Sequence, residues 1–495
     1  MRRWLRFLIP VLPAAIITAA FAQPAPTASS AAPAASMSAS ASAPAAEPAP
    51  PPPAPAQHAP EEPAFPVEEM RLSNGLRVIL APDDTLPDVT VYVRYGVGSR
   101  DEPEGLRGLA HLVEHLMFQM TRHIPRGELL RNLSRGGATH VNGTTHEDAT
   151  TYYETMPPER LELALWLESD RMGYFADVID EAALQQERRV VLTEHRTRHV
   201  DLALGMLPFF TLDATFPSWH PYHEVPDDEP EGLEKITLAD VRAFSTTWYG
   251  PSNATLILAG KFEKENAEAL VKRYFETLPG RPPPARPTLP SIERKGPTRV
   301  QVEANVLLDQ LNLTWVTPAF GAPGDAALDF VAALLARGET SRLEKRLVAS
   351  GIAKRVEASQ QSMALASVFE IEVLLSSGRT AEEARDAVDR ELAELADSGP
   401  TKAELAQVRS YWRNRDLFFL ETSFGRARHV ASFAALGALP APFDWLDRRQ
   451  KSLTARDVTG AVATYLSPKA RAAEIASRPA RKRPIAGVVT RRQEP

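Results

Sequence analysis

Apolar positions recur along the chain with two different periods, and together they predict a mixture of strands and helices that begins near Phe65. Short apolar runs at residues 70–72 and 76–80 flank an Asn-Gly pair, which is typical of a β-hairpin. The run at residues 89–97 is rich in Val and Tyr and favours another strand. Further strands are predicted at residues 136–145, 150–154 and 254–258, and helices at residues 109–118, 157–172, 181–197 and 240–244.

The same pattern returns in the second half of the chain. Residues 311–316 resemble an earlier strand, residues 329–334 can be laid on residues 111–116, and residues 402–407 on residues 181–186. The nearly constant offset predicts two homologous α+β domains in tandem, each with an antiparallel-rich sheet packed by helices. The predicted domains span residues 65–280 and 293–480, joined by a Pro-rich linker at 281–292 and followed by a basic tail at 481–495.

The first 64 residues lie outside this pattern. Three arginines within the first six residues precede an apolar run, and Ala20-Phe21-Ala22 offers a small-residue cleavage site before Gln23, so residues 1–22 are predicted to be a signal peptide. The apolar run is short and contains two prolines, which argues against a permanent membrane span. Residues 23–64 are almost entirely Ala, Pro and Ser and are predicted to form a disordered linker. We therefore expect an exported protein, periplasmic or extracellular.

Composition narrows the chemistry that the chain can carry. Its 495 residues contain no cysteine, which excludes disulfides, thiolate metal ligands and a cysteine nucleophile. The formal net charge is −7 and no long Lys/Arg stripe interrupts it, which argues against nucleic-acid binding. Any bound metal must therefore be held by His, Asp or Glu.

The strongest candidate for such a site is the run His111-Leu112-Val113-Glu114-His115. Positions four apart share one face of a helix, so His111 and His115 would project together with Glu114 beside them. Two neutral imidazoles at this spacing can hold a zinc ion, and a carboxylate that is not a ligand can take a proton from the water of the metal. The alternative is a packed helix whose polar residues have no chemical role, but three ionisable groups among so many apolar neighbours would be costly to bury unpaired.

Two further carboxylates stand on the helix predicted at residues 181–197. Glu187 and Glu194 are seven residues apart and therefore lie on nearly the same face after two turns. In the second copy of the pattern these chemical groups are replaced. The positions of His111, Glu114, His115, Glu187 and Glu194 are taken there by Asp329, Ala332, Ala333, Val408 and Arg415. The second domain is thus predicted to have kept its core and lost the metal site.

These motifs resemble the pitrilysin/insulinase family of zinc metallopeptidases, in particular the half-length branch that includes mitochondrial processing peptidase. The resemblance runs from about residue 65 to about residue 478. It rests on H-x-x-E-H at residues 111–115 and on E-x-x-x-x-x-x-E at residues 187–194. Asn142-Gly143-Thr144-Thr145 stands for the family's N-A-x-T, with Gly143 as a departure. Asp148-Ala149-Thr150-Thr151-Tyr152 and His220-Pro221-Tyr222 are further landmarks.

The resemblance implies roles for individual residues. His111, His115 and Glu194 would bind one zinc ion per chain, and Glu114 would be the catalytic general base. Glu187 would orient a ligand from outside the metal's own shell. Asn142 would meet the backbone of a peptide that adds as a strand at the sheet edge.

The function implied is that of an exported zinc-dependent endopeptidase, which hydrolyses peptides or unfolded polypeptides through Glu-assisted attack of a zinc-bound water. One alternative is a non-catalytic or scaffold subunit of the same fold. Another is a metal-binding or peptide-binding protein, which would keep the ligands but have no use for Glu114.

The resemblance also implies a partner. Full activity in the family requires four units of this fold around a cavity, and this chain supplies two. The unit that faces the zinc usually offers a tyrosine and an arginine to the peptide, but here Lys354 and Val368 stand near those positions. We therefore expect a heterodimer with a zinc-less family member, with a homodimer as the alternative.

Overall fold

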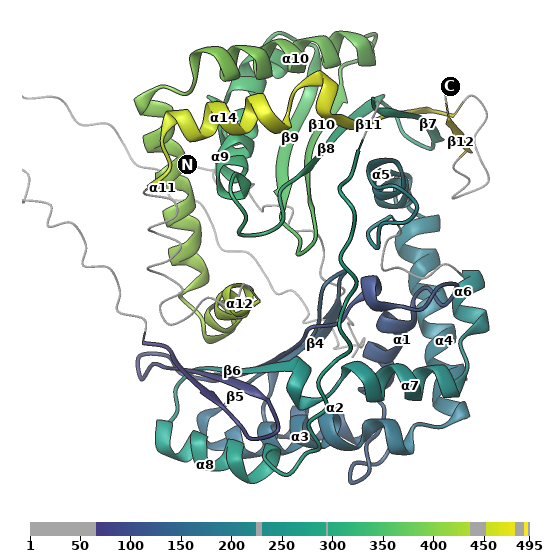
Figure 1. Cartoon of the computed structure of the whole chain (residues 1–495), viewed down its shortest axis with the longest axis vertical. Coiled ribbons are helices and arrows are strands. Elements are labelled where there is room, and N and C mark those ends of the chain that lie inside the picture. Colours follow the sequence, from purple (N-terminus) through teal and green to yellow (C-terminus); the bar gives the residue numbers. More distant parts are fainter. Residues whose placement is uncertain (1–65, 224–229, 294–295, 436–451, 481–489, 494–495) are drawn as a thin grey trace, which may run out of the picture. The chain divides into compact units, whose positions relative to one another are not determined.

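The computed structural model describes residues 66–223, 230–293, 296–435, 452–480 and 490–493 (Figure 1). The predicted signal peptide and the Ala/Pro/Ser linker lie outside the described residues, as does most of the predicted tail. The described residues from Pro66 onward form one compact unit. Within it, two mixed sheets are each packed by helices, which is the two-domain α+β fold expected from the sequence.

The first sheet has the strand order β1-β2-β6-β3-β5-β4. Neighbouring strands are antiparallel except β2 and β6, which run parallel. The predicted hairpin is confirmed, because β1 pairs with β2 across the Asn-Gly turn. The strand bounds are β1 Glu68–Arg71, β2 Arg77–Pro82, β3 Val89–Tyr95, β4 Thr139–Thr145, β5 Thr150–Met156 and β6 Ala254–Gly260. Strand β4 lies at an edge of this sheet.

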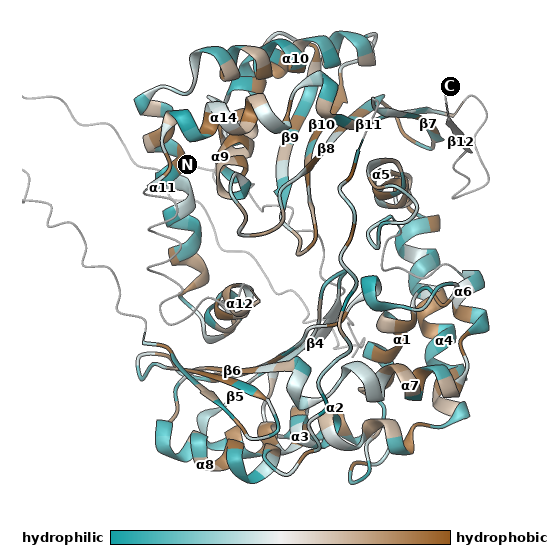
Figure 2. Cartoon of the chain, viewed as in Figure 1, coloured by the Kyte–Doolittle hydropathy of each residue, from teal (hydrophilic) through white to brown (hydrophobic). Residues whose placement is uncertain are grey.

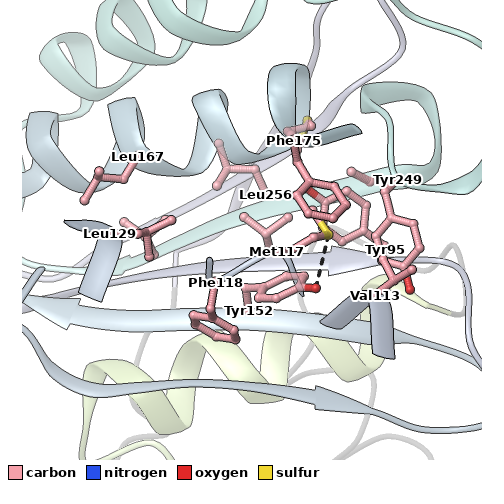
Figure 3. Close-up of a cluster of buried hydrophobic side chains, with 14 of the residues drawn as sticks. Tyr95, Val113, Met117, Phe118, Leu129, Tyr152, Leu167, Phe175, Tyr249 and Leu256 are labelled. Atoms are coloured by element: carbon pink, nitrogen blue, oxygen red, sulfur yellow. Dashed lines mark hydrogen bonds between the residues drawn. The ribbon is translucent and has the colours of Figure 1, made fainter. Parts of the chain in front are cut away.

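Helices of the first half pack on this sheet through one continuous apolar core. Figure 3 shows part of it, where Val113, Met117 and Phe118 pack near Tyr95 and Tyr152. The Tyr152 hydroxyl lies 3.2 Å from Met117 Sδ, which ties the sheet to the segment around the predicted metal helix. The helix bounds are α1 Leu109–Leu116, α2 Glu128–Arg135, α3 Leu161–Val178, α4 Glu181–His195, α6 Pro230–Lys235, α7 Leu238–Trp248 and α8 Lys264–Phe275.

The second sheet repeats the first, with the order β12-β7-β11-β8-β10-β9 and a single parallel pair, β7 with β11. Its strands are β7 Thr298–Ala304, β8 Gln310–Thr317, β9 Ala353–Gln361, β10 Ser367–Leu375, β11 Arg471–Pro479 and β12 Thr490–Gln493. Its helices are α9 Asp325–Ala336, α10 Ala381–Ser398, α11 Lys402–Phe419 and α14 Ala455–Tyr465. Helix α9 is largely hydrophobic and buried, whereas α10 carries many hydrophilic residues (Figure 2).

The two halves exchange one helix each. Helix α5 (Leu207–Thr215) follows α4 in the first half but packs in an apolar cluster with β7 and β11 of the second sheet. Helix α12 (Ser423–Ala434) follows α11 in the second half but lies against β3 and β6 of the first sheet. Strand β1, at one edge of the first sheet, is the first described element of the chain, and β12, at one edge of the second sheet, is the last. Sequence boundaries at residues 280 and 293 do not capture this exchange.

Strand β12 lies within the segment that the sequence identified only as a basic tail. It pairs antiparallel with β7, so the second sheet extends beyond residue 480. None of the helices in the described parts of the chain is both long enough and apolar enough to cross a membrane.

Candidate metal centre

Helix α1 is buried along its whole length, so the polar residues of the H-x-x-E-H run are buried too. His111, Glu114 and His115 are only 4%, 2% and 3% exposed. The helix packs against α4, α7 and strands β4 and β5, and these neighbours are the groups that its polar side chains can meet. Polar groups that are buried without partners are costly, so these three side chains are expected to have partners nearby. The partners indicate the chemistry that the site can carry out.

Helix α4 brings two carboxylates to the histidines. Asp180 caps this helix by accepting a hydrogen bond from the Ala183 amide. Glu194 Oε2 lies 3.2 Å from His115 Nε2 and 3.6 Å from His111 Nε2, and the two Nε2 atoms are 3.2 Å apart. One ligand atom from each of His111, His115 and Glu194 can be chosen so that all three lie within 4.8 Å of one another.

Glu187 is placed on the other side of the His115 ring. Its Oε2 atom lies 3.3 Å from His115 Nδ1, whereas Glu194 faces Nε2 of the same ring. A carboxylate at Nδ1 fixes the orientation of an imidazole and leaves Nε2 free to bind. Glu194 therefore lies within the cluster of possible ligands, whereas Glu187 contacts the other nitrogen of the His115 ring.

Burial and charge act in opposite directions on these groups. Burial alone would lower the pKa of His115, but its hydrogen bond to Glu187 and its close contact with the Glu194 carboxylate outweigh burial and raise that pKa. Burial would raise the pKa of Glu194, but its contact with His115 and its electrostatic interactions with His115, His111 and Arg198 lower it. The carboxylate form of Glu194, which is the metal-binding form, is thus favoured.

Glu114 points to strand β4. Its Oε2 accepts a hydrogen bond of 2.6 Å from the Thr145 hydroxyl. A Cβ atom at Gly143 would lie 2.8 Å from Glu114 Oε1, so the glycine leaves room for this carboxylate. Gly143, the one departure noted in the N-A-x-T motif, therefore sits directly against Glu114.

Asn142 lies on the same edge strand, at a point where the register between β4 and β5 shifts. Its side chain hydrogen-bonds to Tyr153 of β5. The structure thus places Asn142 at the edge of the sheet, as expected, while its predicted contact with a peptide stays a prediction.

Sequence reasoning missed two residues of this centre. Arg198 forms an ion pair with Glu194 Oε1 from within a π-helical turn at Arg196–Val200, and its spacing of four residues was the available signal. Thr145 was quoted only as part of a motif. Its contact with Glu114 depends on how β4 packs on α1, which no local pattern encodes.

The donor set fits zinc. Glu194 Oε2 is buried and has no hydrogen-bond partner of good geometry among the described residues, although both histidine Nε2 atoms lie close to it. Two imidazole nitrogens and one carboxylate oxygen are the ligands of a common class of catalytic zinc sites. In the second half, α9 and α11 carry Asp329, Ala333 and Arg415 at the corresponding positions. No second cluster of this kind occurs within the described ranges.

Comparison with known proteins points to one family. Residues 77–204 match the model described as "Insulinase (Peptidase family M16)", and residues 235–411 match the "Peptidase M16 inactive domain". The chain is 32% identical over 285 residues to "Zinc protease PqqE" of Helicobacter pylori, an alignment that covers 57% of this chain and 63% of that protein. It is 26% identical over 281 residues to "Mitochondrial-processing peptidase subunit beta" of Lentinula edodes, covering 57% and 59%. The chain thus spans less than two thirds of these curated relatives.

Solved structures agree with the fold. A protease from Helicobacter pylori superposes with a TM-score of 0.76 at 27% identity, covering 84% of this chain and 100% of that one. Pitrilysin superposes with a TM-score of 0.71 at 17% identity, covering 88% of this chain and 47% of that one, which is a likeness of fold alone.

Proposed function

Because the chain belongs to the insulinase family, peptidase family M16, we propose that it is a zinc-dependent endopeptidase that hydrolyses peptides or unfolded polypeptides. The observation that carries the proposal is the convergence of His111, His115 and Glu194, with Glu114 next to them on α1. A ligand triad alone would serve a binding protein. A buried carboxylate beside the triad, without a place in it, is what hydrolysis additionally needs.

The roles follow from the contacts. A bound zinc ion would lower the pKa of a water molecule toward about 7 and polarise the scissile carbonyl. His111 and His115 would bind through Nε2, with His115 held in orientation by Glu187 at Nδ1. Glu114 would accept the proton of the attacking water at Oε1, because its Oε2 already accepts from Thr145, and would return it to the leaving amine. No nucleophilic side chain is required.

The peptide would bind along strand β4. This strand is an edge of the first sheet and carries Gly143 and Thr145 against Glu114, so a chain that adds there as a further strand runs past the general base. Backbone hydrogen bonds supply affinity in this mode of recognition, and Asn142 would contribute to them.

A non-catalytic subunit is the alternative function. The family model for an inactive domain matches residues 235–411, mostly in the half where the ligand positions are replaced. The decisive experiment measures zinc content and hydrolysis of an unfolded peptide in one preparation. We expect one zinc per chain and cleavage that a chelator abolishes. Stoichiometric zinc without cleavage, whether the chain is alone or mixed with a zinc-less family member, would favour a binding or scaffold role.

We propose further that the protein is exported to the periplasm or beyond. The supporting features are the tripartite start of the sequence and the similarity to a protein whose solved structure is titled "periplasmic protease PqqL from Escherichia coli". N-terminal sequencing of the mature protein should begin at Gln23. A mature chain that still carries Trp4 would refute cleavage there.

A further inference from the structure

Asp148, in the turn between β4 and β5, contacts Tyr222. Both residues belong to motifs to which the proposed hydrolysis assigns no role. Asp148 belongs to the D-x-T-x-Y stretch and Tyr222 to the His-Pro-Tyr stretch, which lie far apart in the sequence. In the structure the Tyr222 hydroxyl donates a hydrogen bond of 2.5 Å to Asp148 Oδ1. Arg100 forms an ion pair with the same carboxylate. Tyr222 is fully buried, so its hydroxyl depends on protein partners.

These two side chains hold the backbone of the second half. The Ala364 amide donates to Asp148 Oδ2 at 2.8 Å, and the Leu365 amide donates to the Tyr222 hydroxyl at 3.0 Å. Both amides belong to the turn between β9 and β10, which comes from the metal-less unit. We call Asp148, Tyr222 and these two amides the inter-half clamp.

The β4–β5 turn, which carries Asp148, is connected at its other end to the metal centre. Thr145 ends β4 three residues before Asp148, and its hydroxyl donates to Glu114 at 2.6 Å. The turn is stiff, because the His146 amide donates to the Ala149 carbonyl across it. It is also packed tightly, since a Cβ atom at Gly98 would lie 2.0 Å from the His146 carbonyl oxygen. We therefore expect a displacement of Asp148 to be transmitted along the turn to Thr145.

We propose that Thr145 is a positioning residue for the general base Glu114, and that the inter-half clamp makes this positioning depend on the metal-less half. The inference rests on the proposed function and deepens it. A carboxylate that must collect and return a proton needs a fixed orientation. The second half, in which the ligand positions are replaced, supplies part of that orientation by holding the turn that follows Thr145.

The first arm of the test removes the hydroxyl on β4. Thr145→Val should lower kcat by about 10- to 100-fold with little change in KM and with zinc content unchanged. Thr145→Ser, which keeps the hydroxyl, should restore most of the loss. Thr144→Val is the matched control, because Thr144 is on the same strand as Thr145 but its hydroxyl contacts Thr151 of β5 at 2.7 Å and not Glu114. A normal kcat in Thr145→Val, or an equal loss in Thr144→Val, would overturn the positioning role.

The second arm tests the dependence on the other half. Tyr222→Phe should lower kcat by about 2- to 30-fold, and its effect should largely vanish in a Thr145→Val background. Thr215→Val is the control, since it also removes a buried hydroxyl contact between the halves, to Thr314 at 2.8 Å, away from the clamped turn. Multiplicative losses in the double variant would refute the coupling.

A crystal structure of Tyr222→Phe gives a readout that does not need activity. We expect the Thr145–Glu114 contact to lengthen beyond hydrogen-bonding distance. An unchanged contact would overturn the coupling even if the protein proved to have no peptidase activity. Absence of cleavage by zinc-loaded wild-type protein, in the presence of a zinc-less family member, would instead refute the proposed function.

Discussion

Glu187 Oε2 lies 3.3 Å from His115 Nδ1, on the opposite side of the imidazole from the Nε2 atom that faces Glu194. Two carboxylates of helix α4, two turns apart, thus contact the two nitrogens of one imidazole ring. Because a ligand must present one nitrogen and have its ring held by the other, this arrangement assigns different tasks to two chemically identical side chains.

The two glutamates should therefore respond differently to the same change. Glu187→Gln should weaken zinc binding by about 10- to 100-fold, because the amide can still accept from Nδ1 but loses the negative charge. Glu194→Gln should weaken it further, because a ligand atom is lost. Competition with a chromogenic chelator measures both. Equal losses in the two variants would mean that the roles must be exchanged.

Glu114→Gln separates metal binding from catalysis. Its carboxylate is not part of the cluster formed by His111, His115 and Glu194, so zinc content should be unchanged. Hydrolysis should fall by about 10²- to 10⁴-fold, which is the usual contribution of a positioned general base. Near-normal turnover in this variant would show that another group accepts the proton.

As the pH is lowered, zinc affinity should begin to fall at a higher pH than it would at a site whose histidines have the ordinary pKa. The hydrogen bond to Glu187 and the close contact with the Glu194 carboxylate overcome burial and raise the pKa of His115 in the metal-free protein. The protonated ring cannot bind zinc, so protons compete as the pH drops through this raised pKa. The stability of the metal-free fold depends on pH in the opposite direction. Because the pKa of His115 is higher in the folded than in the unfolded protein, protonation of His115 stabilises the fold at pH values below the unfolded pKa. This stabilisation is lost as the pH rises through the folded pKa. In Glu187→Gln the pH at which zinc affinity falls should move down, and an unmoved midpoint would contradict this account.

The metal centre could be predicted from the sequence to the extent that its determinants are local. His111 and His115 are four apart on one buried helix, and Glu187 and Glu194 are seven apart on another, so helical geometry alone groups each pair. That the two helices meet is a tertiary fact, and only the resemblance to a family supplied it beforehand. The contact between Thr145 and Glu114 depends on the packing of β4 on α1, and nothing in either segment encodes it.

The repeated unit was predictable for a similar reason, since apolar spacing survives where function is lost. The matched segments at 329–334 and 111–116 both fall in helices, α9 and α1. The exchange of α5 and α12 was not predictable, because the apolar residues of a helix show that it needs an apolar surface but not which one. Helix α12 finds its surface on β3 and β6, more than 150 residues earlier in the chain.

The attachment of α12 can be tested through one buried hydroxyl. Ser423 Oγ lies 2.8 Å from Thr90 Oγ1 and 2.6 Å from Asp88 Oδ1. Ser423→Ala leaves both partners short of a bond and should lower the free energy of unfolding by about 1–3 kcal/mol, measured in urea. Ser432→Ala on the same helix is the control, since its hydroxyl is exposed and donates to the Arg428 carbonyl within the helix, and its loss should cost less than about 0.5 kcal/mol. Equal effects would show that the Ser423 contacts do not anchor the helix.

The last prediction concerns the partner. We propose that the active particle is a pair of chains, with a zinc-less family member as the second subunit. Lys354 and Val368 stand near the positions where the resemblance implies a tyrosine and an arginine for holding the peptide. In the structure Lys354 is exposed on β9, and Val368 is buried in an apolar cluster with Phe216 and Tyr222. A buried valine cannot hold a peptide carbonyl, so under this proposal the zinc-less partner would supply the contacts opposite the zinc.

A peptide fixed only on the zinc side loses the positioning that makes hydrolysis fast. The purified chain should therefore bind zinc but cleave unfolded peptides slowly, and addition of a zinc-less family member from the same organism should restore cleavage. Rates measured with each chain alone and with the mixture, beside the elution of each sample on a sizing column, distinguish the arrangements. Glu114→Gln mixed with the same partner is the control, because any cleavage that remains would come from a contaminant. Full activity from this chain alone, eluting as a symmetric dimer, would refute the heterodimer and would require two copies of β9 and β10 to complete each other's sites.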